Sequence, residues 1–293
     1  MTAVERMKAA LAHQSQRCVP RGELWLGSDV FRQPGFEGEE SLQTHIKLCQ
    51  EMGMDFLSLP VQEPSQMQAN YRRFKLDEVG EAVATSRLFT CVVVDGPFQR
   101  SAERPGDLSV LSARCDEPGS ARLQEMASAI EETIGALVKR GVSAVVIADD
   151  IAYHRSTYAS PQVIGERLLP LYSRMVGRIH GGGAYALFHS DGNIAPLIPD
   201  LISCGFDGLA GCEPECLDLA HLKKTYGSRL TLMTGIRAGL LEPDSPISAR
   251  KDDFLREVQT LDQGGGFVMC SACGVNSTEA LGRLKTLYAW TGE

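Results

Sequence analysis

Apolar and polar positions along this chain follow two periods, and from residue 117 onward these periods succeed each other regularly. Windows with apolar residues three or four positions apart predict helices, and short apolar runs predict buried strands. One helix start is marked by Ser160 and Pro161, and one helix end by Gly141. The predicted helices cover residues 117–141, 160–183, 193–205, 216–227, 248–265 and 276–290, and the predicted strands cover residues 143–150, 184–189, 206–211, 229–235 and 266–270.

This alternation predicts an α/β fold with a parallel sheet. Because the connections are short and no long segment returns along a sheet edge, a single (β/α)8 TIM barrel is favoured over an open, doubly wound sheet. Residues 22–27 and 56–60 predict the first two barrel strands, after an N-terminal helix within residues 1–17. Residues 71–91 predict a hairpin insertion before a further strand at 91–96. We expect one domain over residues 1–293.

Composition narrows the classes of partner. The chain is 43% hydrophobic and has a net charge of −8, with a pI near 5.4. An acidic chain without a long lysine or arginine run is not expected to bind nucleic acid or an anionic membrane. The absence of a long apolar stretch and of a signal-peptide core predicts a cytoplasmic protein. We expect small-molecule and protein partners, and leave a homo-oligomer open.

The predicted strand ends share a property that points to chemistry. Six of the seven carry an ionisable or thiol group, and in a closed parallel barrel such ends rim one cavity. The nine cysteines are irregularly spaced, which indicates reduced thiols rather than a disulfide framework. The seven ends are Pro60, Asp95, Asp149 with Asp150, His189 with Asp191, Glu213 with Glu215, Thr234 with Arg237, and Cys270 with Cys273.

His189 and Asp191 predict a metal site. They lie two residues apart where a strand ends, so their side chains point the same way. An imidazole and a carboxylate can hold a divalent metal, and a thiolate from Cys273 would complete a three-ligand open site. Each residue has an alternative: His189 as a hydrogen-bond partner of a loop, Asp191 as a helix N-cap, Cys273 as a small buried apolar side chain.

Three acids and three further residues near the predicted rim are candidates for catalysis and substrate binding. Adjacent acids point to opposite faces of a strand, so at most one of Asp149 and Asp150 enters the cavity and the other is expected to orient loops. Asp95 is the third candidate acid. The candidate substrate-binding residues are Tyr153, His154 and Arg237, although a surface loop explains His154 equally well.

Several common catalytic signatures are absent from the sequence. The glycines at 181–183 precede a predicted strand, so they predict a helix end and not a pyrophosphate-binding loop. The chain contains no Gly-x-Ser-x-Gly motif and no His-Glu-x-x-His motif. The sequence therefore gives no support to a nucleotide-binding, serine-hydrolase or HExxH-protease function.

Four segments resemble a known family. They are VPRGELWLG at 19–27, VVVDGPF at 92–98, IADDIAYHRSTYASPQ at 147–162 and FHSDGNIAPLIPDLISCGFDGL at 188–209. With them, the chain resembles the uroporphyrinogen decarboxylase superfamily, in particular its cobalamin-dependent methyltransferase branch, which includes methylcobamide:coenzyme M methyltransferases and corrinoid O-demethylases. The arginine-rich N-terminal segment of the decarboxylases is missing, and PRGELWLG stands in its place. Porphyrinogen decarboxylation is therefore not expected.

The resemblance implies a Zn²⁺ site and a corrinoid (cobalamin) carried by a partner protein. Methyltransferases of this branch hold zinc through a His-x-Cys pair and a late cysteine, which correspond here to His189, Asp191 in place of cysteine, and Cys273. Glu213 lies near the position of a glutamate able to coordinate. A carboxylate in place of a thiolate makes zinc a stronger Lewis acid. This favours demethylation of a small methylated substrate, such as a methoxylated aromatic, with Asp95, Asp149 or Asp150 positioning substrate or returning a proton.

Three alternatives stay open at this point. The methyl group could pass in the opposite direction, from a methyl-corrinoid to a thiol or folate acceptor. The incomplete His-x-Cys motif is also compatible with a metal-free barrel that binds a tetrapyrrole or corrinoid, or that resembles the decarboxylases. A third alternative is a structural subunit of a methyltransferase complex, for which the rim acids would be dispensable.

Overall fold

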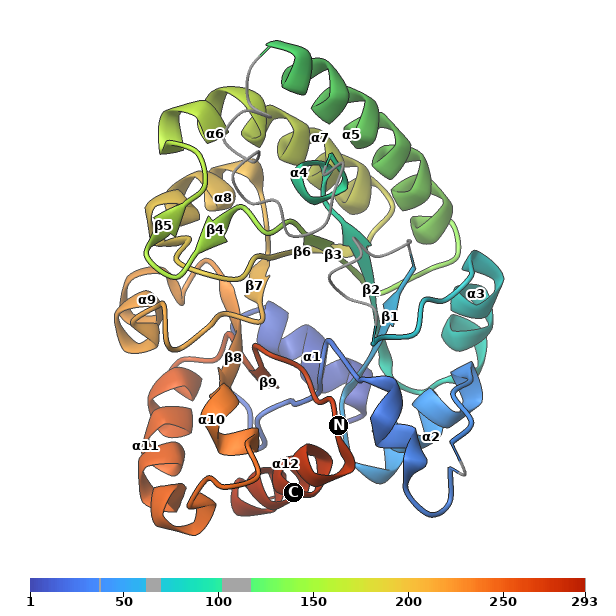
Figure 1. Cartoon of the computed structure of the whole chain (residues 1–293), viewed down its shortest axis with the longest axis vertical. Coiled ribbons are helices and arrows are strands. Elements are labelled where there is room, and N and C mark those ends of the chain that lie inside the picture. The colour runs from blue at the N-terminus through green and yellow to red at the C-terminus, as the bar shows by residue number, and fades with distance from the viewer. Residues whose placement is uncertain (37, 62–69, 102–116, 293) are drawn as a thin grey trace.

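The computed structural model describes residues 1–36, 38–61, 70–101 and 117–292, with the backbone alone at 117–120. Its main element is a parallel sheet of seven strands that curls, with helices on its outside (Figure 1). In spatial order the strands are β1 (Phe56–Pro60), β2 (Phe89–Asp95), β3 (Ala144–Ala148), β6 (Tyr185–His189), β7 (Gly208–Ala210), β8 (Thr231–Ile236) and β9 (Phe267–Ser271).

The helices follow the strands along the chain, as the alternating pattern predicted. Those of seven residues or more are α1 (Ala3–Leu11), α2 (Leu42–Glu51), α3 (Leu76–Thr85), α5 (Glu117–Val138), α6 (Pro161–Arg167), α7 (Leu169–Gly181), α8 (Ile198–Cys204), α9 (Leu219–Tyr226), α11 (Lys251–Asp262) and α12 (Thr278–Trp290). Two four-residue helices, α4 (Pro97–Arg100) and α10 (Ala238–Leu241), follow β2 and β8, and short 3-10 helices cover Ser28–Arg32, Ala195–Leu197 and Ile247–Arg250.

Two apolar cores occupy the two faces of the curled sheet. On β2, Cys91 and Val93 belong to the inner core, whereas Val92 and Val94 pack in the outer core under the helices. This alternation follows from the two-residue period of a strand. Buried on both faces, the strands need continuous apolar runs, which is why the sequence pattern identified them.

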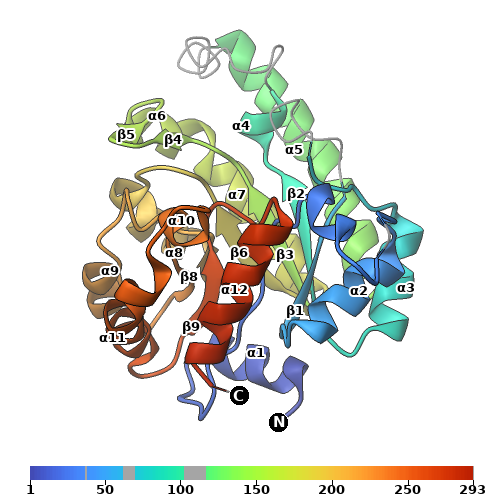
Figure 2. The same cartoon turned by 60° about the horizontal axis from the view of Figure 1, so that its bottom comes forward.

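Helix α1 covers one end of the inner core. Met7, Ala10 and Leu11 of α1 pack with inner residues of the strands, and α1 contacts β1, β2 and β9. Figure 2 shows α1 across the end of the sheet near which both termini lie. The carboxyl ends of the strands lie at the opposite end, so α1 does not cover the side chains at those ends.

The segment between residues 20 and 27 joins the two edges of the curled sheet. Arg21 and Leu26 form isolated parallel bridges with β9 and the turn after it. On the other side, Asp55 N donates to Arg21 O at 2.7 Å, and the Ser58 hydroxyl donates to Leu24 O at 2.7 Å. The predicted first strand thus lies between β9 and β1. Isolated bridges connect it to β9 and the turn after β9, and single hydrogen bonds connect it to β1 and the residue before β1, while the regular sheet has seven strands.

The hairpin predicted over residues 71–91 is wrong. Most of this segment is helix α3, with Val79 and Ala82 buried three residues apart. The Glu78 side chain accepts from the backbone N–H of Lys75, as in a capping box. The polar alternation that suggested strands is therefore the surface of an amphipathic helix. A two-stranded antiparallel sheet does occur later, between β4 (Ala152–Tyr153) and β5 (Ser156–Thr157).

No helix in the described ranges is long and apolar enough to cross a membrane.

Candidate metal centre

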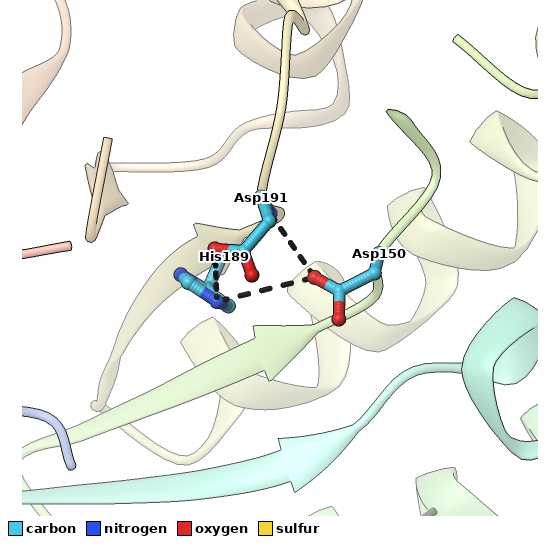
Figure 3. Close-up of side chains that lie close together, drawn as sticks. All are labelled: Asp150, His189 and Asp191. Carbon is cyan, nitrogen blue, oxygen red and sulfur yellow. Dashed lines mark hydrogen bonds and ion pairs between the residues drawn. The ribbon is translucent and has the colours of Figure 1, made fainter. Parts of the chain in front are cut away.

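The candidate site lies where the neighbouring strands β3 and β6 end. Ala148 of β3 is in register with His189 of β6, and both are the last residues of their strands. Asp150 follows β3 by two residues, and Asp191 follows β6 by two residues. Because parallel strands end at the same edge, these side chains meet there, as Figure 3 shows.

His189 is held in one orientation by its neighbours. The side chain is 3% exposed, and its Nδ1 lies 2.7 Å from the carbonyl oxygen of Ala210. A carbonyl oxygen only accepts, so Nδ1 carries the proton and donates. In the neutral ring, Nε2 then has the free lone pair. Nε2 lies 3.6 Å from Asp191 Oδ1 and 4.0 Å from Asp150 Oδ1 (Figure 3).

The two carboxylates are tied to each other as well as to the imidazole. The backbone N–H of Asp191 donates to Asp150 Oδ1 at 3.0 Å. One donor atom from each of Asp150, His189 and Asp191 lies within 4.8 Å of the other two. The Asp191 side chain is 55% exposed, and desolvation by its neighbours raises its pKa to about 6. His189 opposes that shift, and the charges of Asp150 and Glu213 add to it. One nitrogen and two oxygen donors thus converge on one point.

Glu213 supports the loop that carries Asp191. Its Oε2 accepts from the backbone N–H of Gly192 at 2.7 Å and from the thiol of Cys216 at 3.3 Å. The same thiol lies 3.2 Å from His154 Nδ1. Partial desolvation and the Glu213 carboxylate raise the pKa of Cys216 to about 12, so the thiol keeps its proton. Glu213 therefore neighbours the three-residue group without belonging to it.

Cys273 lies on the turn after β9 and is exposed. Its Sγ lies 3.4 Å from the carbonyl oxygen of Gly274, and its own carbonyl oxygen accepts from the Tyr71 hydroxyl at 3.5 Å. The predicted set of His189, Asp191, Glu213 and Cys273 is thus not the set that converges, because Asp150 takes the third place beside His189 and Asp191.

Asp149 faces away from this group, as expected for one of two adjacent acids. Its carboxylate is fully buried and accepts from the backbone N–H groups of Phe98 and Gln99, at 3.1 and 2.6 Å, and from the Tyr172 hydroxyl at 2.7 Å. Burial raises the pKa of Asp149 to about 7, against the effect of these hydrogen bonds. The carboxylate therefore holds the start of α4 against α7.

The predicted substrate-binding residues are not brought together at one place. Arg237 pairs with Glu257 at 2.9 Å, and both line a cavity of about 510 Å³ between α10 and α11 whose lining contains none of Asp150, His189 and Asp191. Tyr153 is 44% exposed, and its ring lies 5.6 Å from that of Tyr158. The backbone of Tyr153 is closer to the site, since its carbonyl oxygen accepts from Asn193 N at 2.9 Å.

Sequence reasoning missed Glu23 and the aromatic side chains beside His189. Glu23 is 1% exposed and accepts from the backbone N–H and hydroxyl of Ser271 and from the Tyr288 hydroxyl. The sequence signal that could have identified Glu23 is an acidic residue inside the apolar run GELWLG. The Trp25 ring lies edge-on to His189 at 5.7 Å and contacts the Tyr71 ring at 5.5 Å. Long-range ring contacts of this kind leave no periodic signal in a sequence.

The uroporphyrinogen decarboxylase (URO-D) family matches residues 113–291 of this chain. A match over more than half of the chain shows that the protein belongs to this family, as its motifs predicted. Within known proteins, the chain is similar to the methylcobamide:CoM methyltransferase MtaA of Methanosarcina barkeri, with 26% identity over 154 residues. This alignment covers 53% of the chain and 42% of MtaA, so the chain matches less than half of that relative's length. The relative from strain Fusaro is 27% identical over 156 residues.

Among solved structures, a methyltransferase from Methanosarcina mazei has a similar fold. The TM-score is 0.72, at 18% identity, and the match covers 99% of this chain and 98% of that one. A vitamin-B12-independent methionine synthase from Listeria monocytogenes gives a TM-score of 0.53 at 13% identity, with 94% and 98% covered. At these identities the likeness concerns the fold alone.

Proposed function

We propose that this protein is a zinc-dependent methyltransferase that moves a methyl group between a small methylated substrate and a corrinoid carried by a partner protein. The observation that carries the proposal is the convergence of Asp150, His189 and Asp191 at the carboxyl ends of β3 and β6. The similarity to MtaA and membership of the URO-D family support methyl transfer as the chemistry.

The donor atoms of this group fit zinc. Imidazole nitrogen and carboxylate oxygen are both zinc ligands, and three protein ligands leave one position for substrate. The bond from His189 Nδ1 to Ala210 O leaves Nε2 as the ligand atom, in the arrangement common for metal-binding histidines. In the absence of substrate, that fourth position could be taken by Glu213, after β7, or by Cys273, after β9. Zinc bound there would supply a Lewis acid that polarises the heteroatom carrying the methyl group.

The remaining roles belong to side chains around the group. Trp25 and Tyr71 form an aromatic wall beside His189 that excludes water and suits an aromatic substrate. Asp150 is both a proposed ligand and the acceptor that holds Asp191 in place. Asp95, buried at the end of β2, would position the substrate or return a proton to it. We propose a methoxylated aromatic as the methyl donor, with the corrinoid as the methyl acceptor.

Transfer in the opposite direction is the second candidate, because the name of the relative MtaA describes transfer between methylcobamide and CoM. The ligand set favours demethylation. Two carboxylates leave a metal less electron-rich than two thiolates would, which strengthens polarisation of an ether and weakens activation of a thiol.

Zinc content and methyl transfer, measured side by side, test the proposal. Elemental analysis of the wild type should give about one zinc per chain, and His189→Ala should lose it. Demethylation would be followed by the absorbance change of reduced cobalamin, supplied free in solution with methoxylated benzoates as methyl donors. The reverse assay would supply methylcobalamin as the methyl donor and a thiol as the acceptor, and would follow the loss of methylcobalamin absorbance. Wild-type protein without metal after reconstitution, or full activity in His189→Ala, would reject the zinc mechanism and leave a metal-free barrel.

A further inference from the structure

A cluster of charged side chains lies beside the candidate metal centre, at the carboxyl end of β2. Asp95 is the last residue of β2, and it is 2% exposed. Arg73 Nη1 lies 3.7 Å from Asp95 Oδ1, and the Arg73 side chain is 14% exposed. Arg100, on α4, is half-buried and within electrostatic range of Asp95. The end of β2 thus brings one buried carboxylate close to two guanidinium groups.

Arg100 has hydrogen-bonding capacity to spare. Its Nη1 is buried and has no hydrogen-bond partner in the part of the chain that the structure describes. Burial lowers the pKa of Arg100, and the Asp95 charge opposes that shift without reversing it. A buried N–H donor without a partner is costly, and an anion satisfies both the donor and the charge.

Arg100 is also held in place. Phe98 and Gln99, its neighbours on α4, donate their backbone N–H groups to the buried carboxylate of Asp149. The Ser101 hydroxyl donates to Phe98 O at 2.7 Å, and Phe98 is 1% exposed. These hydrogen bonds fix the backbone of Arg100 relative to β2. A donor that is already held in place loses less conformational entropy when it binds an anion.

Strand register relates this cluster to His189. Asp95 pairs with Ala148, and Ala148 pairs with His189, so the three lie at one level of the sheet. Neighbouring strands are about 4.8 Å apart, which places the backbones of Asp95 and His189 about 10 Å apart. Ala148, between them, belongs to the inner core and has a small side chain. The span is suited to a substrate about the length of a substituted benzoate.

We propose that Arg73 and Arg100 bind the anionic group of a small organic monoanion, a carboxylate or sulfonate, whose methylated end lies at the Asp150, His189 and Asp191 group. Asp95, which pairs with Arg73, competes with the bound anion for the two guanidinium groups. The orientation of the substrate rests on the proposed function, whereas anion binding by the two arginines does not.

Calorimetric titration of the full chain with 4-methoxybenzoate, 4-methoxybenzenesulfonate and the neutral 4-methoxybenzamide tests this. Both anions, or one of them, should bind at least tenfold more tightly than the amide. Arg100→Gln and Arg73→Gln should each weaken anion binding at least tenfold and leave amide binding unchanged, and Arg100→Lys should restore part of the loss. Asp95→Asn should tighten anion binding, because it removes the competing charge.

The controls separate this site from the metal centre. Arg237→Gln, which alters an arginine paired with Glu257, should leave anion binding unchanged. His189→Ala should still bind the anion, so failure of the zinc mechanism would not affect this result. Equal binding of the anions and the amide, or unchanged anion affinity in folded Arg100→Gln and Arg73→Gln, would overturn the proposal. Anion binding lost in His189→Ala and kept in both arginine variants would place the anion on the metal and overturn it too.

Discussion

The Nδ1–H of His189 donates a hydrogen bond to the carbonyl oxygen of Ala210, 2.7 Å away. The acceptor is a backbone atom of the neighbouring strand, so the ring orientation depends on the sheet itself and not on a mobile side chain. With Nδ1 occupied, Nε2 faces Asp150 and Asp191. This relationship makes the ligand set testable residue by residue.

Asp150→Ala should reduce zinc affinity by at least about 10-fold. Loss of a residue that only hydrogen-bonds to a metal ligand already costs about that much, and loss of a ligand should cost no less. Cys273→Ala should reduce it less, because Cys273 lies outside the converging group. Zinc affinity would be measured by competition with a chromophoric chelator, with Glu213→Gln as a third variant. The reverse order, with Cys273→Ala the more damaging, would assign the thiolate and not Asp150 to the metal.

Gly192→Ala should destabilise the protein more than Gly183→Ala does. Both glycines have positive φ, +84° and +79°, so both substitutions carry a backbone strain of about 1 kcal/mol. A Cβ at Gly183 would meet nothing within 4 Å, whereas a Cβ at Gly192 would lie 2.7 Å from backbone atoms of Tyr153. Gly192→Ala should also weaken zinc binding, because it moves the loop that holds Asp191. Urea unfolding and zinc titration measure the two effects, and equal free energies of unfolding would contradict the steric argument.

Asp149→Asn should lower the free energy of unfolding by roughly 2 kcal/mol, since an amide cannot accept all three donors and places its own N–H groups against them. Tyr172→Phe, which removes one of these donors, should cost about 1 kcal/mol. Neither variant should change zinc stoichiometry. A folded Asp149→Asn protein with wild-type stability and no methyl transfer would instead make Asp149 a catalytic residue.

Glu23 should make the protein less stable as the pH rises. Burial raises its pKa from 4.5 to about 7, so between these values the folded chain keeps a proton that the unfolded chain has released. Stability therefore falls from pH 4.5 to 7, by roughly 3 kcal/mol at most from this group. Asp149, also raised to about 7, contributes with the same sign.

Glu23→Gln mimics the protonated carboxyl and should flatten this dependence in part. Chemical unfolding at pH 5 and pH 8 would compare Glu23→Gln with the wild type and with Glu125→Gln, which alters an exposed residue of α5. The wild type and Glu125→Gln should lose stability between these pH values to the same extent, and Glu23→Gln should lose less. An equal loss in all three would show that Glu23 is ionised at little cost in the folded state.

The strands were predictable because each is a short apolar run between helical segments, and burial on both faces leaves such a run no polar positions. The hairpin predicted at 71–91 was wrong because a pattern that includes polar residues is ambiguous. Its polar residues occur at a spacing compatible with a strand and with the exposed side of a helix, and only packing against the sheet decides between them. The pairing of His189 with Asp191 was predictable from the two-residue period of a strand end.

Asp150 became a partner of His189 only through tertiary structure. The two residues are 39 positions apart, and their contact depends on the register of β3 with β6. Arg237 was a candidate for substrate binding, but in the structure it pairs with Glu257 of α11. That pairing also depends on tertiary structure, because it requires α11 to pack next to Arg237. The clustering of Arg73 and Arg100 around Asp95 likewise required the loop before α3 and helix α4 to meet at one strand end.

By itself the sequence determined the α/β class, the seven strands of the parallel sheet and the family, because apolar periodicity and motif spacing are local properties of a chain. Tertiary structure alone decided which acid joins His189, which acid supports α4, and which arginines lie near Asp95. Those outcomes depend on strand register and helix packing, which bring together residues whose distance along the chain carries no information about their distance in space.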